Sequence, residues 1–181
     1  MSSALSSDGS RGVQRAALVP GVLALLPEYA GETDPVTELR AACLRAVAWL
    51  GEVGGIGVAG SHQGLRLARH LAAEAGVGLD LAPEQPAGLL VVGNGSARRT
   101  EKAPGHLDER AAGWDDELDA ALRAGRLQGL DLGLADELMA DVDGLGTLRD
   151  LGVVEGCSAE VDYADDPFGV MYWVMRWRCA S

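Results

Sequence analysis

A short apolar run, followed at once by a glycine-framed and charged loop, constrains this chain more than any other feature. Leu89-Leu90-Val91-Val92 has the length and composition of a buried strand. Gly93 and Gly95 then allow a sharp turn of the backbone. Because open α/β sheets bind their ligands at the carboxyl ends of buried strands, we expect residues 94–110 to form a structured binding loop. The alternative is a solvated connection laced with ion pairs.

Several side chains of this loop could bind a ligand. The candidates are Asn94, Ser96, Arg98, Arg99, Lys102, His106, Asp108 and Arg110. Arg98, Arg99 and Lys102 bring three positive charges into a chain whose net charge is −12. Such a local reversal favours a small anionic ligand or an acidic segment of a protein partner. The competing interpretation is that these cations pair with Glu101, Asp108 and Glu109.

Strand and helix patterns alternate along the rest of the chain. Strands are expected at 16–19, 56–59 and 170–177, and helices at 34–50, 62–75, 114–122 and 134–148, the last interrupted near Gly144 and Gly146. Asp34 and Ser61 are expected to cap the helices that follow them. This alternation predicts an α/β fold with a mixed central sheet flanked by helices. Segment 170–177 is apolar on both faces, as a strand covered on both sides should be.

Length and composition limit the domain organisation and the partners. The 181 residues fit a single domain at 15–181, preceded by a Ser/Gly-rich stretch, 1–14, that we expect to be disordered. A net charge of −12 and a pI near 4.5 argue against nucleic acid and anionic membranes as partners. No run approaches the roughly 18 apolar residues of a membrane span. Three widely spaced cysteines indicate reduced thiols, so the cytoplasm is the expected compartment.

Two segments also carry a resemblance to a known family. The loop reads Ser96-Ala97-Arg98, then Thr100, Ala103-Pro104-Gly105 and Asp108-Glu109-Arg110, and the closing segment runs from Asp166-Pro167-Phe168-Gly169-Val170 to Trp177. Both are similar to segments of the class III extradiol ring-cleavage dioxygenases, the LigB-like and Memo-like proteins. The similarity is greatest to actinobacterial members that read Gly-Ser-Ala-Arg-Arg in the loop. The resemblance implies a LigB-like three-layer fold, truncated because the connection between Gly76 and Gly88 is short.

The same resemblance bears on catalysis. Family members hold Fe(II) with two histidines and a carboxylate, and a further histidine serves as acid and base. In this chain the first metal ligand falls on Gly21, and the acid–base residue falls on Ala97. His62 and Asp143 are the remaining metal candidates. The resemblance therefore implies that the iron mechanism is lost and that no cofactor is retained.

These features predict a non-catalytic, degenerate family member, a pseudoenzyme that binds a small anionic ligand or a protein partner through residues 94–110. The alternative is a small enzyme of different chemistry, with or without a metal, that uses His62 or His106 and nearby charged residues. A purely structural role, including assembly into a homo-oligomer, is the third option. The choice among these functions depends most on whether four residues converge in the folded chain: His62, Asn94, His106 and Asp143.

Overall fold

The computed structural model describes residues 12–29, 34–81 and 83–179, which form an α/β fold. Within these residues lie five strands, β1 (Arg15–Val19), β2 (Ile56–Ala59), β3 (Gly88–Val92), β4 (Glu160–Asp165) and β5 (Tyr172–Arg178), and four α-helices, α1 (Thr37–Gly51), α2 (His62–Ala75), α3 (Arg110–Ala124) and α4 (Asp143–Leu151). Two short 3₁₀ helices, Leu23–Leu25 and Pro27–Tyr29, follow β1. Of the stretch expected to be disordered, residues 1–11 lie outside the described residues, and residues 12–14 have no regular structure.

The strands form one mixed sheet in the order β2-β3-β1-β5-β4. β1, β2 and β3 are parallel, whereas β5 is antiparallel to β1 and β4 is antiparallel to β5. The three parallel strands therefore end at the same edge of the sheet, which we call the carboxyl edge. Because β5 runs in the opposite direction, its first residue, Tyr172, lies at the carboxyl edge as well.

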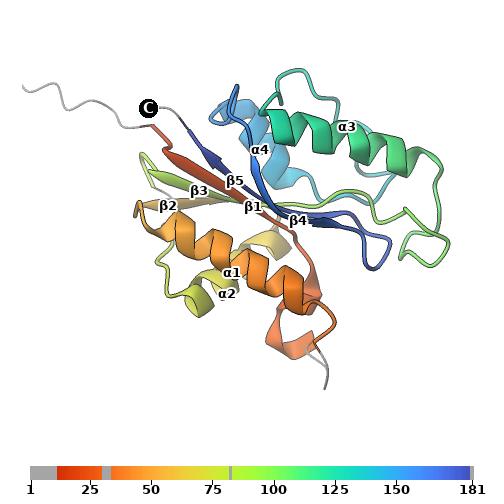
Figure 1. The fold of residues 1–181 in the computed structure, drawn as a ribbon, viewed down its shortest axis with the longest axis horizontal. Coiled ribbons are helices and arrows are strands. Elements are labelled where there is room, and N and C mark those ends of the chain that lie inside the picture. Colours follow the sequence, from red (N-terminus) through yellow and green to blue (C-terminus); the bar gives the residue numbers. More distant parts are fainter. Residues whose placement is uncertain (1–11, 30–33, 82, 180–181) are drawn as a thin grey trace, which may run out of the picture.

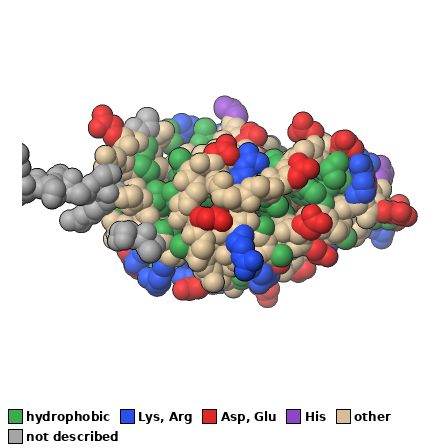
Figure 2. Space-filling view, turned by 90° about the horizontal axis from the view of Figure 1, so that it is seen from above, with side chains coloured by type: hydrophobic (Ala, Val, Ile, Leu, Met, Phe, Trp, Pro, Cys, Tyr) green, Lys and Arg blue, Asp and Glu red, His purple; other side chains and the backbone are tan. Residues whose placement is uncertain are grey.

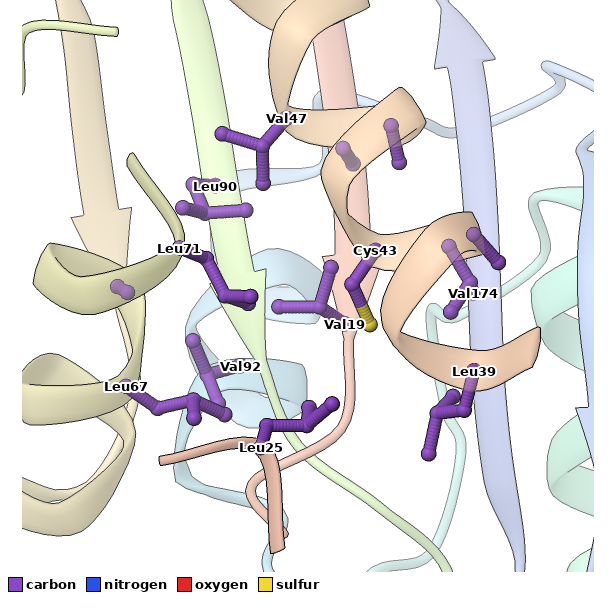
Figure 3. Close-up of a cluster of buried hydrophobic side chains, with 14 of the residues drawn as sticks. Val19, Leu25, Leu39, Cys43, Val47, Leu67, Leu71, Leu90, Val92 and Val174 are labelled. Atoms are coloured by element: carbon purple, nitrogen blue, oxygen red, sulfur yellow. The ribbon is translucent and has the colours of Figure 1, made fainter. Parts of the chain in front are cut away.

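Helices cover both faces of the sheet and create three layers (Figure 1). α1 and α2 lie on one face, where Val47 and Leu71 pack with strand residues such as Val19 and Leu90 (Figure 3). α3 and α4 cover the other face. Each fully buried Val or Leu contributes about 1.5–3 kcal/mol to folding, so the two apolar layers fix the helices against the sheet. The predicted α/β class, with a mixed sheet between helices, is confirmed.

β5 is buried on both faces, as its sequence predicts. Tyr172 and Val174 belong to the core beneath α1 and α2, whereas Trp173, Met175 and Trp177 belong to the core beneath α3 and α4. Both indole N–H groups are satisfied: Trp173 donates to a carboxylate oxygen of Asp119 and Trp177 donates to the carbonyl of Leu122. The alternation of side chains along a strand accounts for this division.

The helix expected at 134–148 is wrong over its first half. Residues 133–139 form turns, Met139 has a positive φ of 54°, and α4 begins only at Asp143. Between them Asp141 forms an isolated β-bridge with Asn94, at the end of β3. The regular spacing of Leu134, Leu138, Leu145 and Leu148 therefore results from their packing against the sheet and does not indicate one continuous helix. The bridge carries Asp141 to the carboxyl edge.

The starts of α2 and α1 and the presence of β4 depend on local hydrogen bonds and strand pairing. Ser61 caps α2 as predicted, its Oγ accepting the N–H of Gly64. α1 begins at Thr37 rather than directly after Asp34, because Asp34 Oδ1 accepts the N–H of Val36 and residues 35–36 form a turn. β4 is not anticipated, because its acidic and largely exposed sequence has little strand propensity; pairing with β5 holds it in place.

The described surface over α3 and α4 has no strongly basic patch (Figure 2). On the face seen from above α3 and α4, acidic and basic side chains are scattered among one another (Figure 2). In the part of the chain that the structure describes, no helix combines the length and the apolar character that a membrane crossing requires. All three cysteines are free, and burial raises the pKa of the Cys43 thiol to about 12, which keeps it protonated.

Candidate functional site

A cavity of about 640 Å³ opens at the carboxyl edge of the sheet. The loops that follow β1, β2 and β3 contribute Gly21, Ser61 and Asn94 to its wall, and the segment before α4 contributes Asp141. The other described lining residues are Val22, Leu23, Ala24, Gln63, Pro104, Met139, Ala140, Val170 and Tyr172. The cavity has the size of a small-molecule site, and it lies where open α/β sheets bind their ligands. We therefore treat it as the candidate site.

Hydrogen bonds link the polar groups of the cavity wall. Ser61 Oγ donates to Asp141 Oδ2 at 2.8 Å, and the N–H of Gly21 donates to Asn94 Oδ1 at 3.3 Å. Gln63 Nε2 donates to the carbonyl oxygen of Gly21 at 2.7 Å. The N–H of Asn94 also donates to the carbonyl of Asp141 at 2.9 Å. Residues from four separate segments are thus held in one network before any ligand arrives.

Asp141 is the charged group of this network. Burial raises the pKa of its carboxyl group, while hydrogen bonds from Ser61 and from the N–H of Asp143 act in the opposite direction. Asp141 makes no ion pair with any residue that the structure describes. A carboxylate with this environment is a candidate for ligand binding or proton transfer.

The remainder of the cavity wall is mainly apolar. Val22, Leu23 and Val170 line it, together with Tyr172, whose phenol pKa is raised to about 12 by burial and which therefore stays protonated. Met139 lines the cavity, and half of its surface is exposed. Its positive φ of 54° places its backbone in the left-handed region. A non-glycine residue in that conformation costs about 1–2 kcal/mol, and such strain is concentrated at functional sites.

The 94–110 loop forms backbone hydrogen bonds with distant segments, and it supplies one wall of the cavity through Asn94 and Pro104. Ser96 is fully buried: its N–H donates to Asp115 Oδ1 at 2.8 Å and its Oγ donates to the carbonyl of Leu138 at 2.9 Å. Arg99 joins the loop to two other segments, because its guanidinium bonds both Asp115 and Asp166. These buried contacts, rather than exposed ion pairs, fix the loop.

The positive charges of the loop are directed away from the cavity. Arg98 donates to the carbonyl of Glu137, and Arg99 is held between its two aspartates. Arg110 pairs with Asp108 and with Glu137, which lowers the pKa of the Asp108 carboxyl group to about 2. The arginines that suggested an anionic ligand therefore have partners within the protein. The expected ion pairs of Arg98, Arg99 and Lys102 with Glu101, Asp108 and Glu109 do not occur among the described residues, and Asp108 pairs with Arg110 instead.

Lys102 and His106 remain exposed on the outer part of the loop. Lys102 lines a second cavity of about 580 Å³, which also includes Glu101, Asp166 and Phe168. His106 has a positive φ of 58°, and its ring contacts the carbonyl of Glu101. Neither residue lines the cavity at the carboxyl edge.

The described residues do not fit a catalytic iron of the family type, which needs two histidines and a carboxylate. Asp141 is the only such group in the described lining, and no cluster of three or more His, Cys, Asp or Glu suited to a metal occurs among the described residues. His62 and Asp143 are exposed and do not line the cavity, so the group His62, Asn94, His106 and Asp143 does not converge there. Ala97 is packed in the core.

Ser61, Gln63, Asp141 and Tyr172 are lining residues that the sequence analysis does not propose as ligand-binding groups. Ser61 follows β2 at the same edge at which Asn94 follows β3, and this shared position after a strand is a signal that could have found it. Asp141 has no such local signal, because its place depends on the bridge to Asn94. Tyr172 is placed by the antiparallel direction of β5.

Comparison with known proteins adds no further constraint: no protein-family model matches the chain, and no curated protein matches it significantly. The relationship to the extradiol dioxygenases consequently rests on the residues quoted above and stays a prediction.

Proposed function

We propose that this protein binds a small molecule in the cavity at the carboxyl edge, as a non-catalytic relative of the extradiol dioxygenases with a truncated LigB-like fold. The observation that carries the proposal is the convergence of Ser61, Asn94 and Asp141, which come from three separate segments, on one partly apolar cavity. A purely structural protein has no need to hold a carboxylate without a cation at such a place.

The residues at the family's catalytic positions support the non-catalytic part of the proposal. Gly21 would occupy the position of the first metal ligand, and it lies in the cavity wall. Ala97 would occupy the position of the acid–base histidine, and its methyl group cannot transfer a proton. The alternative enzyme would use His62 or His106, and neither side chain reaches the cavity. We also propose the cytoplasm as its compartment, in keeping with three free thiols.

An NMR fragment screen tests the proposal. Backbone amide spectra of the wild-type protein are recorded with a library of small polar and aromatic compounds. We expect some of them to shift the amides of Gly21, Ser61 and Asn94. Gly21→Val should weaken this binding, since a Cβ at Gly21 would lie 3.1 Å from Asp141 Oδ2. Gly113→Val on exposed α3 surface is the matched control. A library without a single hit at these amides would contradict the proposal.

A further inference from the structure

The cavity holds a carboxylate that the described part of its lining does not neutralise. Among the described lining residues, Asp141 is the only carboxylate and none is a lysine or an arginine. The three arginines of the neighbouring loop bond other groups. Removing a carboxylate from water without pairing it costs free energy, and groups in this situation are concentrated at binding and catalytic sites.

Structural contacts hold Asp141 in place without supplying a positive charge. Its carboxylate accepts hydrogen bonds from Ser61 Oγ and from the N–H of Asp143. That N–H belongs to the first turn of α4, where the helix dipole favours negative charge. Burial nevertheless outweighs these contacts and raises the pKa of Asp141. The contacts therefore orient the carboxylate but do not provide a cation.

Because Gly21 has no side chain, two oxygen acceptors of the cavity wall approach the same side of its backbone. A Cβ built on Gly21 would lie 3.1 Å from Asp141 Oδ2 and 3.3 Å from Asn94 Oδ1. The two oxygen acceptors therefore lie close together on the side of Gly21 where a side chain would begin. An ammonium group has three donors and no acceptor, so it matches both oxygens at once.

We propose that the ligand is a small organic amine, whose ammonium group bonds Asp141 and Asn94 beside Gly21. This inference rests on the proposed ligand-binding function and adds the charge and class of the ligand. The apolar wall formed by Val22, Leu23 and Val170 accommodates the body of the amine. A bare metal ion matches the site less well, because a single carboxylate falls short of the oxygen ligands that Ca²⁺ or Mg²⁺ collects.

The test compares three probes of similar shape and different charge: 2-phenylethylamine, 2-phenylethanol and 3-phenylpropionate. Affinities are measured by NMR titration of the cavity amides in the wild-type protein. We expect the amine to bind about tenfold to a hundredfold more tightly than the alcohol, the range that a charge-assisted hydrogen bond provides. The carboxylate should bind more weakly than either. Titration with Ca²⁺ and Mg²⁺ alone should leave these amides unshifted.

Two variants test whether Asp141 causes the preference for the amine over the alcohol. Asp141→Asn should reduce the ratio of amine to alcohol affinity to near one, whereas Asp143→Asn, two residues away and exposed, should preserve the ratio. Equal binding of amine and alcohol at the cavity amides by the wild-type protein would overturn the amine inference and leave the ligand site intact. If none of the three probes binds in the cavity, the amine inference is also overturned. The fragment library described above then tests the proposed ligand-binding function separately. A metal-induced shift that exceeds the amine's would overturn it as well. The wild-type comparison stands even if Asp141→Asn fails to fold.

Discussion

Removal of the Arg99 guanidinium should destabilise the fold strongly, because it leaves a buried carboxylate without its cation. The Asp115 side chain is 1% exposed, and Arg99 Nη1 lies 3.0 Å from Asp115 Oδ2. Breaking a buried pair by removal of one partner costs about 3–5 kcal/mol. Asp115 keeps its hydrogen bond from the N–H of Ser96, so we expect Arg99→Met to lower the free energy of unfolding by about 3 kcal/mol, near the lower end of that range.

The matched control is Arg66→Met, which breaks an exposed pair with Glu28 and should cost about 0–1 kcal/mol. Both variants are measured by urea denaturation. Burial already acts to raise the pKa of Asp115, and loss of Arg99 raises it further. A carboxyl group whose pKa is raised in the folded state favours folding when it is protonated. The loss of unfolding free energy in Arg99→Met should therefore become smaller as the pH falls from neutral through the pKa of Asp115 in the folded variant. A loss of unfolding free energy no larger than that of Arg66→Met, or one that is independent of pH, would show that Arg99 does not neutralise a buried carboxylate.

Three further predictions concern other parts of the chain. Purified protein should hold no stoichiometric iron and should not cleave catechols, because the family's histidines are replaced; elemental analysis that finds about one iron per chain, with ring-opening of protocatechuate, would show the opposite. Thiol titration under denaturing conditions without reductant should count all three cysteines, and a count of one would reveal a disulfide. Gly125→Ala should lower the free energy of unfolding by about 2 kcal/mol or more, since Gly125 has a φ of +58° and an added Cβ would meet the carbonyls of Val154 and Cys157; Gly113→Ala, in open space within α3, should instead stabilise by up to about 1 kcal/mol.

Local sequence patterns were sufficient to predict most of the helices and strands. The β2 and α2 bounds agree with the prediction, because an apolar strand is followed by a capping serine and a helix that ends at a glycine. β5 was recognisable from its apolar residues on both faces. The order of the strands could not be read from the sequence, since it depends on which apolar faces meet in three dimensions. β4 escaped detection for a similar reason: it is a strand because β5 offers it an edge.

The candidate site was harder to predict than the fold. Asn94 was accessible because it follows β3 directly. Charge was misleading, because Arg99 and Arg110 stand out in the sequence but bond acids from distant segments. Asp141 was passed over in favour of its neighbour Asp143, and only the bridge between Asp141 and Asn94 distinguishes the two. Long-range pairing of this kind leaves no periodic pattern in a single sequence.

If the 94–110 loop is a fixed wall of a ligand cavity, its backbone amides should be protected from hydrogen exchange. The N–H groups of Asn94, Gly95 and Ala97 donate to the carbonyls of Asp141, Met171 and Leu138. We predict that these amides exchange far more slowly than they would in an unstructured peptide, and more slowly still with a bound ligand. Exchange at the rates of an unstructured peptide would show a flexible linker and would contradict the account.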